Sequence, residues 1–412
     1  MPEWLEFQRQ PKTQTLKTKK GRVNMARAAS LFNQLLQQFP RAEFQRLVNQ
    51  SGAESRAKGF ASWSQFVSML FCQVARADSL REISNGLACC VGKLSHLGLK
   101  KAPPRSTLSY ANMNRPAELF QYLFYRTLED FRSRKMLGLR KPFRFRNKLT
   151  TFDSTTITLA LSAFPWAKYR SKKGGIKLHV LMDNADTMPD FVHITEARVN
   201  DCRVLRDLKL KPESIVVLDR GYNDFRQYGN WTMEGVYFVT RLKRNTLFQV
   251  IEERVPPSGR HILSDELIVL TGQGAKKCPD TLRLVRAVDP ETGEKIDILT
   301  NNLELGASTI SGIYRERWRI EEFFRLLKQN LKIKSFVGTN ENALLTQIWT
   351  ALTALLLLKW LHFVSRAGWS FSTLASMLRM NLFTYRDLLD WLEDPFKVPP
   401  LEPVPEQLCL GL

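Results

Sequence analysis

The sequence lacks the residue patterns that usually build a zinc site or a disulfide framework. It has six cysteines, and none of them forms a Cys-x-x-Cys pair. Its five histidines are scattered along the chain. This pattern excludes a zinc finger of ordinary spacing, and it indicates a protein that works in a reducing compartment, which we expect to be the cytoplasm.

Apolar segments that could enter a membrane are also scarce. Residues 1–22 are polar and basic, and they lack the apolar stretch of a signal peptide. The most apolar run, Ala343–Leu361, contains threonine, glutamine and Lys359. We therefore expect a buried helix at this run and no membrane span.

Acidic residues are few for a chain of this length. Among 412 residues there are 61 lysines and arginines but only 40 aspartates and glutamates, which gives a net charge of +21. This excess predicts a polyanionic partner, most simply nucleic acid, and a basic protein of membrane surfaces is the weaker alternative. The apolar content of 44% can support the cores of two or three domains.

The first third of the chain has the apolar periodicity of helices. Residues 1–24 are expected to form a basic arm that either lies along phosphates or is merely solvated. Helices are predicted at Ala28–Phe39, Ala42–Gln50, Ser62–Arg76, Ser79–Val91 and Pro116–Ser133. Residues 134–147 are basic without a clear period, and we interpret them as a linker.

A short polar helix is predicted directly after the two prolines at positions 103 and 104, with Ser106 as its cap. Side chains of the kind that contact phosphates and base edges are expected on its surface: Arg105, Ser109, Asn112 and Arg115. Together with the helix Ser79–Val91 it would form a helix-turn-helix. The alternative is an ordinary short helix of a bundle.

From Lys148 the pattern changes to that of strands. They are predicted at Leu149–Leu161, Ile176–Asp183, Phe191–Ala197, Ile215–Leu218 and Val236–Leu242. Helices are predicted from Asn200 to Leu208 and from Tyr222 to about Met233, so the order indicates an α/β layer. Residues 244–302 contain further strand patterns joined by proline and glycine turns, which indicates a β-rich segment.

One long helix is predicted over Tyr314–Lys328, which has no glycine or proline, with Ser308 or Thr309 as its cap. At about 100° per residue, four side chains share one narrow polar stripe: Tyr314, Arg317, Glu321 and Lys328. Trp318 lies beside this stripe, where it either stacks on DNA or packs against the protein, and packing is the favoured interpretation. The alternative for the element is an amphipathic helix with weak surface pairs.

Three carboxylates stand out by their position. Asp153 lies in the first predicted strand, Asp219 directly follows the buried strand Ile215–Leu218, and Glu321 lies in the polar stripe. Carboxylates that converge at strand ends repel one another unless cations neutralise them, and oxygen ligands suit Mg²⁺ or Mn²⁺. Two such ions about 3.5–4 Å apart support phosphodiester chemistry. The alternative is that both aspartates are turn or cap residues.

These residues carry a resemblance to a known family. The chain resembles the DDE transposases of bacterial insertion sequences of the IS-four type. The signature motif of that type is Tyr-x2-Arg-x3-Glu-x6-Lys, and four residues match it: Tyr314, Arg317, Glu321 and Lys328. The stretches Asp153-Ser154-Thr155 and Asp219-Arg220-Gly221-Tyr222 resemble its two catalytic-aspartate motifs. The resemblance covers most of the chain.

The resemblance implies an α/β fold with an RNase H-like catalytic core, which is interrupted by a β-rich insertion and preceded by an all-helical DNA-binding domain. The expected helical domain is 1–135. The core is expected at 136–243 and 304–368, around an insertion at 244–303. A C-terminal helical segment and tail would follow at 369–412.

The resemblance also implies cut-and-paste transposition by a homodimer that binds double-stranded DNA, namely the element's terminal inverted repeats and target DNA. Asp153, Asp219 and Glu321 would hold two Mg²⁺ or Mn²⁺ ions. Tyr314, Arg317 and Lys328 would bind phosphates near a hairpin intermediate. The family can hold a flipped base on an aromatic residue of the insertion, and since no tryptophan lies between residues 232 and 317, Phe248 or another group would serve.

The remaining assignments are less specific. A basic segment is predicted to contact the DNA backbone through Lys168, Arg170, Lys172 and Lys173, with a solvated loop as the alternative. His179 is expected to be a satisfied core histidine. The rival functions are a DNA-binding protein that no longer cleaves and an RNase H-like endonuclease without strand transfer. The complete set of three acids favours an active transposase, which we expect in the bacterial cytoplasm at the nucleoid.

Overall fold

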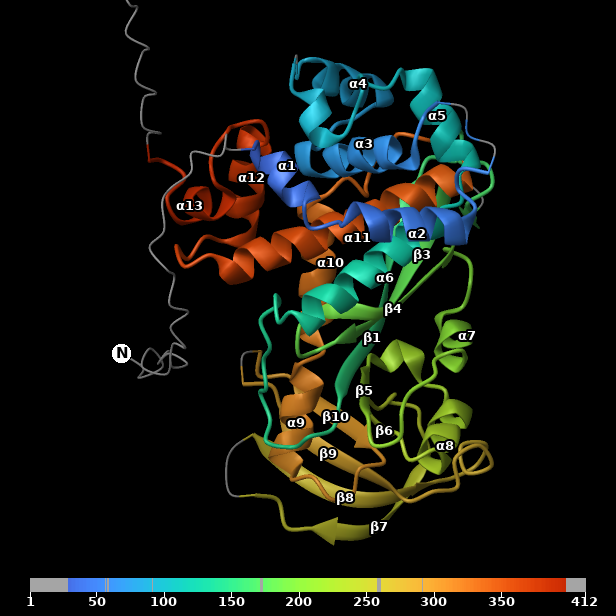
Figure 1. The fold of residues 1–412 in the computed structure, drawn as a ribbon. Helices are drawn as coiled ribbons and strands as arrows, with labels where there is room; N and C mark the ends of the chain where they lie inside the picture. Colours follow the sequence, from blue (N-terminus) through green and yellow to red (C-terminus); the bar gives the residue numbers. More distant parts are fainter. Residues whose placement is uncertain are drawn as a thin grey trace, which may run out of the picture.

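The computed structural model describes residues 29–397, except residues 56, 58, 91, 171–172, 258–260 and 291. The basic arm predicted for residues 1–24 and Lys172 lie outside the described residues, as does the proline-rich stretch from residue 398. Figure 1 shows a layer of helices at one end of a long sheet, whose central strands have helices on both sides.

The helical layer begins with elements that match the predicted ones to within a few residues. They are α1 (Leu31–Leu36), α2 (Arg41–Ser51), α3 (Ser62–Ala75), α4 (Leu80–Ala88), α5 (Arg105–Asn114) and α6 (Glu118–Ser133). A 3₁₀ turn, η1 (Leu94–Leu97), lies between α4 and α5. These two helices contact each other, but their connection is much longer than the turn of a helix-turn-helix, so that prediction is wrong in its connection.

Helices from the end of the chain complete the same layer. The helix α11 (Glu341–Val364) runs across it and contacts α3, α5 and α6 (Figure 1). After it come α12 (Phe371–Asn381) and α13 (Leu388–Glu393). A β-bridge joins Ser30, just before α1, to Tyr385. The N-terminal and C-terminal helices therefore share one hydrophobic core.

Within the described residues, α11 is the helix that is long and apolar enough to cross a membrane. However, 89% of its most apolar window is buried inside the protein. This agrees with the buried helix predicted for the run Ala343–Leu361.

The described strands form one mixed sheet. They are β1 (Leu149–Leu159), β2 (Lys168–Arg170), β3 (Lys173–Asp183), β4 (Met188–Glu196), β5 (Ile215–Leu218), β6 (Tyr237–Arg241), β7 (Phe248–Arg254), β8 (Ile262–Leu270), β9 (Leu282–Val288) and β10 (Lys295–Thr300). Their order is β2-β3-β1-β5-β6-β10-β9-β8-β7, and β4 also pairs with β3. Parallel pairing joins β1 to β5 and β5 to β6. The β-rich segment thus continues the central sheet through β10.

Strand β5 is buried on both faces because helices cover both sides of the sheet. Val216 and Leu218 pack in one core with α7 (Asp201–Arg206) and α8 (Phe225–Met233). Ile215 and Val217 pack in another core with α9 (Ala307–Arg315). This explains the continuous apolar run of the strand, and it fixes the strand end that leads into Asp219.

The single helix predicted over Tyr314–Lys328 is wrong, because the chain bends between α9 and α10 (Trp318–Asn330). Glu316 and Arg317 keep right-handed helical backbone angles at the junction. Asn184 is buried and donates from Nδ2 to the carbonyl oxygen of Glu316 at 3.4 Å. The same carbonyl oxygen also accepts a hydrogen bond from the N–H of Arg319 at 3.1 Å, which is the i to i+3 pattern of a tighter turn.

Two predicted helix caps are also wrong. The residue before α9 is Gly306, which makes no side-chain cap, so neither Ser308 nor Thr309 caps this element. Likewise α5 starts two residues earlier than a Ser106 cap would require, after Pro104, and Ser106 lies inside the helix.

Candidate active site

Two of the three predicted carboxylates lie side by side near the carboxyl end of the central strand β5. In the parallel pair of β1 and β5, Phe152 is the partner of Leu218. Asp153 is the next residue of β1 and Asp219 directly follows the end of β5, and neighbouring strands lie about 4.8 Å apart. Their equivalent register places both aspartates level with the carboxyl end of β5, the kind of position where such sheets bind ligands.

Asp153 is in a desolvated position. Burial raises the pKa of its carboxyl group to about 6, and the charge of Asp219 acts in the same direction. Its Oδ1 atom accepts hydrogen bonds from the backbone N–H of Ser154 at 2.7 Å and from the hydroxyl of Tyr222 at 3.2 Å. These bonds and Arg317 oppose the rise without reversing it, so the carboxylate lacks a full counter-charge.

Asp219 also caps a short 3₁₀ helix, η2 (Arg220–Tyr222). Its Oδ2 atom accepts a hydrogen bond from the N–H of Gly221 at 3.2 Å. The cap interpretation is therefore confirmed. It does not compete with ligand binding, because the other carboxylate oxygen makes no hydrogen bond within the described residues.

Glu321 is held by an ion pair with Arg317 at the bend between α9 and α10. The distance between Arg317 Nη1 and Glu321 Oε1 is 2.5 Å. Burial alone would lower the pKa of Arg317, but the charges of Glu321 and Asp219 more than reverse this effect. One guanidinium therefore links the third carboxylate to the pair of aspartates.

The other two members of the predicted polar stripe are turned toward the protein. Tyr314 is only 7% exposed and lies in the core between α9 and the sheet, where burial raises its pKa. Lys328 Nζ donates to Thr155 Oγ1 at 2.5 Å and to the carbonyl oxygen of Thr156 at 3.2 Å. Burial lowers the pKa of Lys328. Lys328 thus contacts β1 close to Asp153, while Tyr314 packs in the core under α9.

The donor set suits a divalent cation in its chemistry. Asp153, Asp219 and Glu321 offer the carboxylate oxygens that Mg²⁺ and Mn²⁺ prefer, and Asp153 lacks a full counter-charge. In the described part of the chain, no three histidine, cysteine or acidic side chains are close enough together to form a metal-binding group. In this arrangement Glu321 is paired with Arg317 instead.

Comparison with known proteins decides the family. The sequence profile of the transposase DDE domain matches residues 145–357, which is more than half of the chain. The chain belongs to the DDE transposases of insertion sequences. This match begins just before β1 and ends within α11, so it contains Asp153, Asp219 and Glu321. A second profile, a domain of unknown function (DUF4372), matches residues 27–100 of the transposase, in the helical layer.

Relatives of the transposase carry the same assignment in their names. A protein of Sinorhizobium fredii named for a transposase, y4zB, is 31% identical over 310 residues, which cover 73% of this chain and 83% of the relative. A Geobacillus stearothermophilus protein named for the transposase of insertion sequence element IS5377 is 31% identical over 257 residues, 61% of this chain and 67% of the relative. A Synechocystis protein named for element IS4SA is 28% identical over 161 residues, 38% and 44% of the two chains.

Trp318 of the transposase is exposed, so the favoured packing interpretation is wrong. It is the first residue of α10, and 66% of it is accessible to solvent. It lies in sequence directly after Arg317 and three residues before Glu321, within one helical turn of both. Phe248, by contrast, is partly buried against the core that contains α7 and α8.

The residues predicted to contact DNA from the N-terminal helices divide into two groups. Arg105 is exposed and Ser109 is partly exposed on α5, as expected. Asn112 is only 1% exposed, and its Oδ1 accepts a hydrogen bond from Gln65 Nε2 at 2.9 Å. Arg115 is also buried and donates to Gln65 at 3.2 Å. The expectation of an exposed Asn112 and Arg115 is wrong, because a buried polar network satisfies both.

The basic segment predicted to contact DNA is part of a strand pair. Lys168 and Arg170 bound β2 and Lys173 begins β3, while Lys172 lies outside the described residues. Their contact with DNA stays a prediction. His179 is fully buried and its Nε2 lies 2.9 Å from Thr195 Oγ1, which confirms its place in the core. Its Nδ1 has no hydrogen-bond partner in the described part of the chain and lies 3.5 Å from Asp201 Oδ1, so the expectation of a fully satisfied histidine is wrong.

Sequence reasoning missed the groups that surround Asp153. Tyr222 donates to it, and this residue had a signal because it belongs to the motif Asp-Arg-Gly-Tyr. Ser154 Oγ donates to Asp201 Oδ1 at 3.0 Å, and Lys177 Nζ lies 3.0 Å from Asp201 Oδ2. No local pattern could have joined Lys177 to Asp201, because the pair depends on how β3 and α7 meet in space.

Proposed function

We propose that the transposase cuts its insertion sequence out of donor DNA and joins it to target DNA, with Asp153, Asp219 and Glu321 as its catalytic acids. The observation that carries this proposal is the parallel register of β1 and β5, which sets Asp153 beside Asp219. The guanidinium of Arg317 adds the link to Glu321. The transposase names of the relatives support the same reaction class.

The strand order supports an RNase H-like core. Strands β4, β3 and β1 are antiparallel neighbours, and β5 and β6 then run parallel to β1. We assign residues 136–243 and 304–368 to this core. Residues 244–303 would be the insertion, which lengthens the sheet through β10. Residues 1–135 and 369–412 are assigned to DNA binding and to the C-terminal helical segment.

The proposed reaction exchanges one phosphorus–oxygen bond for another at each step. Water attacks the phosphorus at the element's end, and the 3′-oxygen leaves as a hydroxyl. That 3′-hydroxyl attacks the opposite strand, closes a hairpin and releases the flanking DNA. Water opens the hairpin, and the 3′-hydroxyl finally attacks target DNA.

DDE transposase domains use divalent metal ions, and Asp153, Asp219 and Glu321 are the residues that would hold them, two ions per site. Bound Mg²⁺ or Mn²⁺ would supply the charge that activates the attacking oxygen and stabilises the leaving one. The chain itself orients Asp153 through the hydroxyl of Tyr222. Since Glu321 is paired with Arg317, it would join the aspartates once Arg317 turns to a DNA phosphate.

The polar stripe would hold the bent strand of the hairpin. Arg317 and Lys328 are the cations that would bind phosphates, in place of their contacts with Glu321 and Thr155. The ring of Tyr314 lies 5.9 Å from the guanidinium carbon of Arg317 and would support its position from the core side. We further propose a homodimer in the DNA complex, each protomer acting on one of two paired ends, in the bacterial cytoplasm at the nucleoid.

Alanine substitutions at the three acids test this proposal. Purified Asp153→Ala, Asp219→Ala and Glu321→Ala variants should bind a duplex of the element's end as wild type does but nick it at less than about one-hundredth of the rate, since binding rests on cations and chemistry on carboxylates. Glu322→Ala is the matched control, because Glu322 lies next to Glu321 and forms an ion pair with Arg325 on the exposed surface. Gel analysis of labelled ends with Mg²⁺ measures the rates.

Each result has a clear meaning. Near-normal nicking by any of the three variants would remove that acid from the site. Wild-type protein that nicks but never joins ends to a target plasmid would support the endonuclease alternative. Wild-type protein that binds ends but does not nick them would support the DNA-binding alternative.

A further inference from the structure

A cluster of polar side chains lies on the sheet directly beside Asp153. In the antiparallel pair of β1 and β3, Ser154 is the partner of His179, and Lys177 comes two residues before His179 on the same strand. These three side chains therefore share one face of the sheet. Asp201, the first residue of α7, contacts all three of them through its carboxylate, so it joins two strands to a helix.

Both oxygens of the Asp201 carboxylate are held in place. Its Oδ1 atom accepts a hydrogen bond from Ser154 Oγ at 3.0 Å, and its Oδ2 atom accepts one from Lys177 Nζ, also at 3.0 Å. The side chain of Lys177 is only 14% exposed, and its amine also donates to the carbonyl oxygen of Val199 at 3.0 Å. A charge that is largely buried needs a paired partner. The ion pair with Lys177 therefore fixes the position from which Asp201 holds Ser154.

Ser154 in turn contacts the carboxylate of Asp153. Its backbone N–H donates to Asp153 Oδ1 at 2.7 Å, and the hydroxyl of Tyr222 donates to the same oxygen at 3.2 Å. The first of these bonds depends on the position of the backbone at Ser154, which the bond to Asp201 anchors against α7. Asp153 Oδ2 accepts no hydrogen bond from the described residues. One oxygen of Asp153 is thus used for orientation, and the other is left for a ligand.

We propose that Asp201 is a positioning residue of the transposase, which holds the carboxylate of Asp153 in place through Ser154. The pair with Lys177 fixes Asp201, and the bond to Asp201 fixes the backbone of β1 beside the catalytic carboxylate, so that Oδ2 of this group stays available to a divalent cation. Asp201 itself is not a ligand in this proposal, because both of its oxygens are used. The inference rests on the proposed function, since it concerns how one of the proposed catalytic acids is oriented.

The test uses the full-length transposase with single and double substitutions. Ser154→Ala removes the hydroxyl that Asp201 holds, Asp201→Ala removes the acceptor of that hydroxyl, and the double variant removes both groups. Asp201→Asn is the conservative variant, because its amide oxygen can still accept a hydrogen bond from Ser154. Asp207→Ala is the matched control, since Asp207 is exposed at the other end of α7 and forms no ion pair within the described residues.

Nicking of a labelled element's end by preassembled complexes is measured over a range of Mg²⁺ concentrations. At saturating Mg²⁺, Ser154→Ala and Asp201→Ala should each nick about 10–100-fold more slowly than the control, as is usual for residues that orient a metal-binding group. The double variant should be no slower than the slower single variant, because both substitutions break the same link. The Mg²⁺ concentration at half the maximal rate should rise severalfold, and Asp201→Asn should recover part of the rate. Losses that multiply in the double variant, or a Ser154→Ala variant that nicks like the control, would overturn the inference.

Thermal unfolding separates positioning from general damage to the fold, without any reaction taking place. In EDTA, Ser154→Ala should keep the midpoint of the control, because it leaves the pair of Lys177 and Asp201 intact, whereas Asp201→Ala leaves Lys177 unpaired and should lower the midpoint. Ser154→Ala therefore decides the test even where Asp201→Ala fails to fold. The Mg²⁺ concentration that gives half of the full rise in midpoint should be severalfold higher for Ser154→Ala than for the control. An Mg²⁺ response equal to that of the control would overturn the inference.

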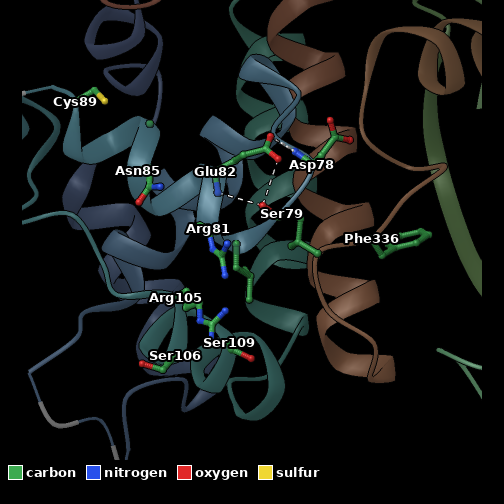
Figure 2. Close-up of a pocket in the computed structure, with 13 residues that line it drawn as sticks. Asp78, Ser79, Arg81, Glu82, Asn85, Cys89, Arg105, Ser106, Ser109 and Phe336 are labelled. Carbon is green, nitrogen blue, oxygen red and sulfur yellow. Dashed lines mark hydrogen bonds between the residues drawn. The ribbon is translucent and has the colours of Figure 1, made fainter.

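Binding of the element's end provides the last readout. Figure 2 shows the broad cleft of the helical layer, to which we assign DNA binding, and no residue of the polar cluster on the sheet is among those that line it. Fluorescence anisotropy should therefore give the same affinity for Ser154→Ala as for the control, and an affinity that falls as much as the nicking rate would overturn the inference. If Asp153→Ala nicks as wild type does, the proposed function fails. If Asp153→Ala is inactive while the variants of Ser154 and Asp201 nick like the control, only the positioning assignment fails.

Discussion

Arg317 and Glu321 bind each other across one turn at the start of α10, with 2.5 Å between Nη1 and Oε1. The same guanidinium also lies within electrostatic reach of Asp219 and Asp153. A group expected to hold DNA phosphates thus neutralises a proposed catalytic carboxylate in the DNA-free chain. Binding of a phosphate by Arg317 and release of Glu321 toward the aspartates would then be one coupled event.

Arg317→Ala should slow hairpin closure more than the first nick. The nick needs water and one bound strand, whereas the hairpin needs a tightly bent strand held against its own charge repulsion. A charge-assisted phosphate contact is worth roughly 1.5–3 kcal/mol, so about a tenfold or greater loss in the rate of closure is expected. A time course of nicked, hairpin and excised products in preassembled complexes measures both steps. Equal slowing of both would make Arg317 a general DNA clamp.

Lys328→Ala should show the same division between the two steps. Its amine is partly desolvated and donates hydrogen bonds to Thr155 and Thr156 on β1. A small movement would let the amine bind a DNA phosphate near Asp153 instead. Arg325→Ala is the control, since Arg325 also lies on α10 but is exposed and pairs with Glu322. Hairpin closure should slow about tenfold in the first variant and little in the second. Similar slowing by both substitutions would mean that hairpin closure depends on the positive charge of α10 and not on the position of Lys328.

Sequence patterns predicted the structure correctly where the residues of one short segment decide its conformation. The strand Ile215–Leu218 has the predicted bounds, because a short, continuous apolar run suits a strand covered on both faces. The positions of Asp153 within a strand and of Asp219 directly after one followed from the same patterns. The same patterns could not show that the two aspartates are neighbours in space. That closeness depends on the parallel register of β1 and β5, which pair across about 65 residues of chain.

The bend at Glu316 shows where such rules fail. Nothing in the local sequence interrupts a helix there, and Glu316 accepts a hydrogen bond from Asn184, a residue from the turn after β3 that no local pattern could have placed beside it. On the two sides of this break, Tyr314 of α9 is 7% exposed and Trp318 of α10 is 66% exposed. Helical wheels give the angle between side chains, but they do not tell which polar residue finds a buried partner, as Asn112 does in Gln65.

Asn112→Ala should destabilise the transposase without changing its choice of DNA sequence. The substitution leaves the buried amide of Gln65 without its partner, which costs about 1–3 kcal/mol. Asn114→Ala is the matched control, because Asn114 is exposed on the same helix and bonds only Tyr110 within it. Urea unfolding and anisotropy with end and random duplexes measure the two effects. A stable variant with weaker preference for the end would restore Asn112 as a base-reading residue.

Trp318→Ala should impair excision while leaving stability unchanged. The side chain is 66% exposed, so its removal uncovers little of the core, whereas stacking on a base is worth roughly 1–3 kcal/mol. We expect excision to slow about tenfold, and Trp318→Phe to recover part of the rate. Product yields on labelled ends and the thermal midpoint are the two measurements. A large fall in the midpoint with normal excision would show that the ring supports the fold.

Asp153→Asn should stabilise the metal-free transposase at neutral pH. In the unfolded chain an aspartate has a pKa of about 3.9, while burial raises the pKa of Asp153 to about 6 in the folded state. Between these values the folded state retains a proton that the unfolded state has released, so stability falls as pH rises through this window and stays lower above it. Asparagine removes this cost.

In EDTA, the variant should therefore unfold at a higher temperature than wild type at pH 7.5, by on the order of 2 °C, with a smaller difference at pH 5. Adding Mg²⁺ at pH 7.5 should raise the midpoint of wild type more than that of the variant, because only wild type has the full set of acids. A variant less stable than wild type at pH 7.5 would mean that the bonds from Ser154 and Tyr222 outweigh the desolvation of the carboxylate.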